Sequence, residues 1–313
     1  MISKKVKKCF THFASNYMQS MAINAIQAII QSMTCKSYSS CQLKIEKANE
    51  LTRLLKANTY PNDQIEKLLE EFMRSEAPII HRWNSQGIST LDLITKQTTT
   101  YPALLKSESD SISFNGRVFF FNAVVQGGLS EMDFEHKELV AKQNAHYQKT
   151  FMGICECDQF LFSIGGQLKP GCVSQISVKY DVKSNKWINL PNLKTGRAEN
   201  CAVQFDYQWI YTLCGINSEY KFVKRIEMLS IKHPTSWQEI VAKPDQSINI
   251  LMAQALPISS SDILIFGSTT GNYKFHIFDN KYELLSYGYF CDQSELIFTS
   301  IPILYKGKIY AVG

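Results

Sequence analysis

Residues 160–191 read FLFSIGGQLKPGCVSQISVKYDVKSNKWINLP and form the clearest structural unit in the chain. The apolar run 160–164 predicts a buried strand that ends at the pair Gly165-Gly166. Two glycines at a strand end allow positive φ angles and a sharp turn, because they carry no Cβ atom. A second strand ends near Tyr180 and a short polar turn leads to Trp187, so we expect these two rings to meet across a hairpin.

Other parts of the chain repeat the apolar strand that runs into a glycine. The copies are IYTLCG (210–215), ILIFGS (263–268) and IYAVG (309–313), with weaker versions in VFFFNA (118–123) and IIHRWN (79–84). Successive copies are spaced by 38 to 53 residues. Most are preceded by one further strand and followed by an outer hairpin. The repeated unit is therefore predicted to be a four-stranded antiparallel sheet, and a series of such sheets is typical of a β-propeller.

The best copy resembles a kelch repeat, whose pattern is a double glycine, then tyrosine, six residues, tryptophan and a later arginine. The matching residues are Gly165, Gly166, Tyr180, Asp181, Trp187, Pro191 and Arg197. The next copy keeps Gly215 and Trp237 but has Cys214 at the first glycine, and Gly267 marks a later copy. The resemblance covers residues 79–313 and implies a kelch-type propeller.

The number of blades stays open between five and six. In a five-bladed ring, residues 297–313 supply the inner strands of a blade whose outer strands lie in 88–103. In a six-bladed ring, the last blade is cut short at Gly313. Closure by the two ends is favoured, because it leaves no exposed strand edge.

Residues 1–78 are predicted to be a helical extension of amphipathic helices. Apolar residues recur at helical spacing in 13–33 and again in 41–75, which favours packing on the neighbouring domain, on a partner, or on a second copy as a coiled coil. Residues 1–45 hold six lysines and no arginine or acid. A mitochondrial presequence is equally acid-poor but rich in arginine, so an ordinary amphipathic helix is favoured.

Composition favours a cytoplasmic, globular protein without a nucleic-acid or membrane partner. Of 313 residues, 45% are hydrophobic and 19% charged, and no apolar run reaches the length of a transmembrane helix. The nine scattered cysteines favour a reducing compartment. Of the net charge of +5, residues 1–78 contribute 11 Lys/Arg against 7 Asp/Glu, and the remainder holds 22 against 21. A nearly neutral body lacks the basic face that nucleic-acid binding requires.

We find no catalytic, cofactor-binding or metal-binding set, and we predict that the protein is not an enzyme. The six histidines are dispersed and have no metal-ligand spacing. The alternative is a propeller enzyme or metal protein. It would be either a copper-oxidase-like ring with Tyr, His and Cys ligands, as some kelch-type enzymes have, or a zinc-finger remnant in the extension. For the remnant, Cys9 and His12 have the spacing of half a zinc site, but Cys35 and Cys41 lie too far apart to complete it.

The remaining class is a protein-interaction or adaptor module that binds a partner through its loops. Loops held by a rigid scaffold are common recognition surfaces, and exposed Arg and Tyr side chains often anchor partners. The candidate partner-binding residues are Lys169, Arg197, Asn217, Tyr220, Lys221, Lys243, Asn272 and Tyr273. Arg197 has a second interpretation as a scaffold residue, because its kelch equivalent follows the last strand of a blade.

Overall fold

The structure is a computed structural model that describes residues 79–84, 87–92, 96–102, 110–114, 117–121, 128–145, 149–206, 208–243, 252, 254–259, 261–266, 272–286, 303–305 and 308–310. These residues form a mainly β protein of antiparallel sheets, and none of them lies in a helix. None of the described residues belongs to a helix that is long and apolar enough to cross a membrane. The predicted helical extension and the zinc-finger remnant within residues 1–78 lie outside the described residues, as does Gly267.

Four sheets have four strands each, and in each the neighbours are hydrogen-bonded in chain order. The first consists of β4 (Ser111–Phe114), β5 (Arg117–Phe121), β6 (Leu129–Asp133) and β7 (Glu138–Ala141), and the second of β8 (Gly153–Cys157), β9 (Phe160–Ile164), β12 (Ser177–Asp181) and β13 (Lys186–Asn189). The third consists of β14 (Cys201–Phe205), β15 (Trp209–Leu213), β16 (Arg225–Ser230) and β17 (Gln238–Val241). The fourth consists of β18 (Gln254–Pro257), β19 (Asp262–Phe266), β20 (Asn272–His276) and β21 (Lys281–Ser286).

Smaller sheets complete the described part of the chain. They are the three-stranded β1 (Ile79–Asn84), β2 (Gly87–Asp92) and β3 (Thr98–Pro102), the ribbon of β10 (Gln167–Lys169) and β11 (Cys172–Val173), and the pair β22 (Ile303–Tyr305) and β23 (Lys308–Tyr310). The β10–β11 ribbon lies within the connection from β9 to β12, where only a loop was expected.

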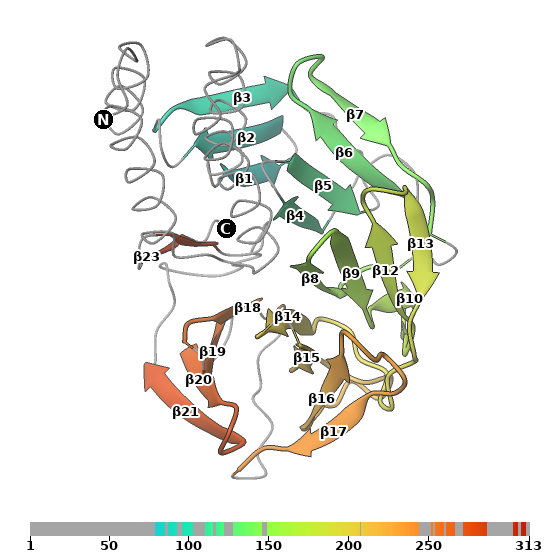
Figure 1. The fold of residues 1–313 in the computed structure, drawn as a ribbon, viewed down its shortest axis with the longest axis vertical. Helices are drawn as coiled ribbons and strands as arrows, with labels where there is room; N and C mark the ends of the chain where they lie inside the picture. Colours follow the sequence, from blue (N-terminus) through green and yellow to red (C-terminus); the bar gives the residue numbers. More distant parts are fainter. Residues whose placement is uncertain are drawn as a thin grey trace, which may run out of the picture.

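Consecutive sheets contact one another through their first strands. β1 contacts β4, β4 contacts β8, β8 contacts β14, and β14 contacts β18. Figure 1 shows these sheets following one another along a curve, from β1 through β8 to β18, with their last strands on the outside. This arrangement brings the face of each sheet against the face of the next.

The hydrophobic core lies between consecutive sheets rather than at one centre. In β9, Phe162 and Ile164 pack with Trp237 towards the next sheet, while Leu161 packs with Tyr180 towards the preceding one. β9 is therefore covered on both faces, which explains why residues 160–164 are almost uniformly apolar. Alternate side chains of a strand point to opposite faces, so a single central strand serves two cores.

The predicted hairpin of Tyr180 and Trp187 is present. The two residues are paired across β12 and β13, and their ring centroids lie 5.2 Å apart. The Tyr180 hydroxyl donates a 2.6 Å hydrogen bond to Oδ1 of Asn185, which has a φ of 56° in the turn. Asp181 completes the turn by accepting hydrogen bonds from the backbone N–H groups of residues 183 and 184. Hydrogen bonds between nearby residues thus stabilise this turn.

The glycine pair takes the predicted positive φ angles, 65° at Gly165 and 96° at Gly166. An added Cβ on Gly165 would lie 2.5 Å from the carbonyl oxygen of Arg197, so the position excludes a side chain for steric as well as conformational reasons. In the next sheet, Cys214 occupies the equivalent place and adopts a φ of 60°. The backbone shape therefore persists there without glycine.

One expected boundary was wrong. Asn272 and Tyr273 were predicted to lie in a loop, but β20 begins at Asn272 and ends at His276. Tyr273 is paired with Ile265 on one side and with Leu284 on the other, and a register shift separates it from Asn272. Residues 277–280 form the turn instead.

His81 joins the first two sheets. Its ring is 1% exposed, and its Nδ1 and Nε2 atoms each lie 2.8 Å from a serine hydroxyl, on Ser113 and Ser111 of β4. Burial lowers the pKa of His81 from 6.5 to about 3. His81 therefore takes up a proton below pH 6.5 in the unfolded chain, but only near pH 3 in the folded protein.

We expect the free energy of unfolding to fall as the pH is lowered from 6.5 towards 3, because protonation of His81 favours the unfolded state. The contribution is up to about 1.4 kcal/mol per pH unit. Between pH 6.5 and 5, wild-type protein should lose about 2 kcal/mol more than His81→Asn, measured by urea unfolding at each pH. Parallel curves for the two proteins would show that the pKa of His81 is the same in the folded and unfolded states.

Candidate partner-binding surface

Three connections meet at one end of the sheets and form one continuous surface. They are residues 165–176, between β9 and β12; 190–200, between β13 and β14; and 214–224, between β15 and β16. The first and second are joined by a 2.8 Å hydrogen bond from the backbone N–H of Gly166 to the carbonyl of Arg197. The second and third are joined by the bridge between Ala198 and Ile216. We call this the three-loop surface.

Exposed side chains of both apolar and basic character project from the three-loop surface. Leu168 on β10 is 39% exposed and Tyr220 is 67% exposed. The Tyr220 hydroxyl also reaches the β10–β11 ribbon, where it would lie 3.5 Å from a Cβ built on Gly171. Lys169 and Lys221 are exposed beside them, and Lys221 forms a 2.8 Å ion pair with Glu219. The surface therefore combines an aromatic group, an aliphatic group and positive charge.

Asn217 fixes the loop that carries Tyr220. Its Oδ1 atom accepts hydrogen bonds from the backbone N–H groups of Glu219 and Lys221, at 2.9 and 3.0 Å. Its backbone carbonyl accepts a 3.0 Å bond from the N–H of Tyr220. Tyr220 has a φ of 57°, which is uncommon for a bulky residue, so these bonds hold the backbone in an unfavourable conformation. The tyrosine is consequently presented to solvent from a fixed backbone.

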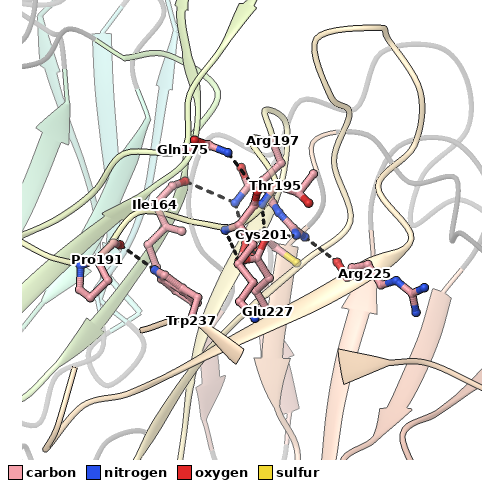
Figure 2. A network of polar contacts seen from close by, with 12 residues as sticks. Ile164, Gln175, Pro191, Thr195, Arg197, Cys201, Arg225, Glu227 and Trp237 are labelled. Carbon is pink, nitrogen blue, oxygen red and sulfur yellow. Dashed lines mark hydrogen bonds and ion pairs between the residues drawn. The ribbon is translucent and has the colours of Figure 1, made fainter. Parts of the chain in front are cut away.

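A buried network centred on Glu227 fixes the middle connection (Figure 2). The Glu227 carboxylate accepts hydrogen bonds from the backbone N–H groups of Lys194 and Thr195, at 2.7 and 3.1 Å, and from Nη2 of Arg197 at 2.7 Å. Nη1 of Arg197 donates to the carbonyl of Arg225 at 2.9 Å. Glu227 and Arg225 lie on β16, so the network attaches residues 194–197 to the following sheet.

The Arg197–Glu227 ion pair is completely buried, with both side chains 0% exposed. Burial lowers the pKa of Arg197, and the Glu227 carboxylate opposes that shift. Arginine remains charged in proteins, so the pair is ionic. Removing either partner leaves an uncompensated charge buried in the protein, which makes the pair a strong determinant of local geometry.

Two further contacts hold the same connection. The indole N–H of Trp237 donates a 2.8 Å hydrogen bond to the carbonyl of Pro191 (Figure 2). Nε2 of Gln175 donates a 3.0 Å bond to the carbonyl of Lys194 (Figure 2). Trp187 makes an equivalent hydrogen bond: its indole nitrogen lies 2.7 Å from the carbonyl oxygen of Gln143. Gln143 follows β7, which is the last strand of the preceding sheet. Both tryptophans thus bind the chain that leaves the sheet before them.

The structure brings four of the predicted partner-binding residues to the three-loop surface: Lys169, Asn217, Tyr220 and Lys221. Arg197 belongs to the same connections, but its side chain lies inside the protein on Glu227, as its scaffold interpretation requires. Asn272 and Tyr273 lie in β20 instead of a loop. The side chain of Lys243 is exposed, and its backbone pairs with residues 280–282 at the edge of β21.

The sequence analysis missed three residues of this region. Leu168 and Lys194 are exposed on the three-loop surface, and the buried Glu227 carboxylate binds the backbone of Lys194 from inside the protein. The only signal for Glu227 was an acidic residue within the apolar segment RIEMLS, which forms β16. A charge at such a position indicates a buried partner, but it does not say which one.

Potential metal ligands are not clustered in the described residues. They contain no group of three or more His, Cys, Asp or Glu side chains that could hold a metal ion. Both ring nitrogens of His276 face carboxylates, Asp262 at 2.6 Å and Glu283 at 2.9 Å, so neither is directed at a hydroxyl or thiol nucleophile. Burial raises the pKa of the Cys157 thiol to about 12, which disfavours the thiolate.

Comparison with known proteins gave no relative: no protein-family model and no curated protein matches this chain.

Proposed function

We propose that the chain is a kelch-like β-propeller that acts as a protein-interaction module and binds a protein partner through the three-loop surface. Three observations support the propeller. Consecutive four-stranded sheets contact one another through their first strands. Their cores lie between faces. Trp187 and Trp237 make the same indole-to-carbonyl bond in two consecutive sheets.

The observation that carries the proposed function is an exposed aromatic residue on loops whose backbone is fixed by hydrogen bonds to Asn217 and Glu227. Tyr220 is 67% exposed on a backbone fixed by Asn217, and the neighbouring connection is fixed by Glu227. Ordering a flexible loop costs binding free energy, so prior immobilisation favours association. Tyrosine supplies a large contact area with few rotatable bonds and is enriched among the residues that dominate interfaces.

Site-specific photo-crosslinking tests this proposal. Benzoylphenylalanine replaces Tyr220 in one protein and Phe278 in a second, and each protein is irradiated in a cell extract. Phe278 is a matched control, because it is aromatic, 79% exposed, and lies in the turn before β21. The protein that carries the crosslinker at position 220 should form discrete crosslinked products that position 278 does not form.

A further inference from the structure

The three-loop surface carries an excess of positive charge that the fold does not neutralise. Its exposed lysines are Lys169, Lys194, Lys221 and Lys224. Its carboxylates are Glu219, which pairs with Lys221, and Glu199, which is half-buried. Burial raises the pKa of Glu199.

Three of these lysines have no ion-pair partner among the residues that the structure describes. Among the described residues, Lys169, Lys194 and Lys224 take part in no ion pair. Arg197 adds nothing to the surface charge, because Glu227 neutralises it inside the protein. The positive charge is therefore available to a bound molecule.

We infer that the three-loop surface binds an acidic peptide segment of a partner protein, an inference that rests on the proposed function. Complementary charge increases the association rate and selects against basic partners. Leu168 and Tyr220 lie on the same surface and offer apolar contact to a side chain between the carboxylates. The lysines are spread over three connections, which suits an extended segment better than a single anionic group.

The three connections lie close enough to act on one ligand. The Tyr220 hydroxyl reaches the ribbon near Gly171, and a Cβ built on Gly196 would lie 3.3 to 3.4 Å from atoms of residues 173–175. The network around Glu227 holds Lys194 and Thr195 by their backbone N–H groups. Lys194 therefore projects from a backbone that need not reorganise when the peptide binds.

The test uses fluorescence anisotropy with a fluorescein-labelled peptide of glutamate, glycine and leucine. A second peptide has glutamine in place of every glutamate, and a third probe is a single-stranded polyuridine RNA. We expect the full-length protein to bind the acidic peptide, to bind the glutamine peptide at least about tenfold more weakly, and to lose affinity for the acidic peptide as salt is added.

Two variants with the same change in net charge show which lysines bind the acidic peptide. The surface variant combines Lys169→Glu, Lys194→Glu and Lys224→Glu, and the control variant combines Lys183→Glu, Lys186→Glu and Lys232→Glu. All three control lysines are exposed. Lys183 and Lys232 lie in the turns between the third and fourth strands of these two sheets, and Lys186 is the first residue of β13. The surface variant should bind the acidic peptide at least about tenfold more weakly, and the control variant within about twofold of wild type. Equal melting temperatures establish that both variants are folded.

Several results would overturn the inference. If the glutamine peptide bound as tightly as the acidic peptide, negative charge on the ligand would not contribute to binding. Equal losses in both variants would show attraction to the net charge of the protein instead of to this surface. Binding of the RNA with the same dependence on the surface lysines would indicate a general polyanion site. If crosslinking through position 220 succeeds while the acidic peptide fails, the interaction surface stands and only the acidic partner is wrong.

Discussion

Glu227→Ala should lower the free energy of unfolding by about 3–5 kcal/mol, because it leaves the buried Arg197 charge without a partner. The same change removes the acceptor of the backbone N–H groups of Lys194 and Thr195. Each buried donor left unsatisfied costs about 1–3 kcal/mol more unless water enters. Urea unfolding followed by circular dichroism measures the change.

Glu135→Ala is the matched control for this substitution. Glu135 lies in the turn between β6 and β7, and its side chain is exposed. Substitution of an exposed residue of this kind changes stability by less than about 0.5 kcal/mol. If Glu227→Ala had an equally small effect, the network of Figure 2 would not hold the sheets and the connection together. Should Glu227→Ala be insoluble, Glu227→Gln retains an acceptor and should be destabilised less.

Trp237→Ala should destabilise the protein by about 3–5 kcal/mol, as expected for a large aromatic residue deleted from a core. Trp237 is 1% exposed and packs with Phe162 and Ile164 of the preceding sheet, and its indole also binds the carbonyl of Pro191. The substitution therefore removes contacts between two consecutive sheets and leaves a buried carbonyl without its donor. Thermal and urea unfolding both report this loss.

Trp187→Ala provides the comparison, because Trp187 makes the equivalent hydrogen bond but is only half-buried. Less apolar surface is lost, so the expected destabilisation is smaller than for Trp237→Ala. A loss at Trp187 as large as at Trp237 would contradict the assignment of Trp237 to the core between sheets. Trp237→Phe should recover part of the packing and isolate the contribution of the indole N–H.

The sequence predicted the strands and turns well where the interactions are local. The apolar run of β9, the glycine pair at its end and the hairpin of Tyr180 with Trp187 follow from burial, backbone freedom and turn chemistry over short distances. The β20 boundary was misjudged, because Asn272 and Tyr273 have the character of loop residues and only pairing with β19 and β21 makes them a strand.

The candidate site was less predictable, because its geometry depends on contacts between distant residues. Arg197 and Glu227 are 30 positions apart, and no local pattern pairs them. Arg197 therefore looked like an exposed loop residue, although the fold buries it. Tyr220 was predicted correctly as a loop residue, but its φ angle and its support by Asn217 follow from the folded loop alone.

Photo-crosslinking at position 220 compared with position 278 tests the proposed interaction surface most directly. Mass spectrometry identifies the crosslinked protein, and an excess of unmodified wild-type protein should suppress the product if it competes for the same partner. The three-loop surface predicts a competed product at position 220 and none at position 278. Products at position 278 alone, or none that wild-type protein competes away at position 220, would contradict it.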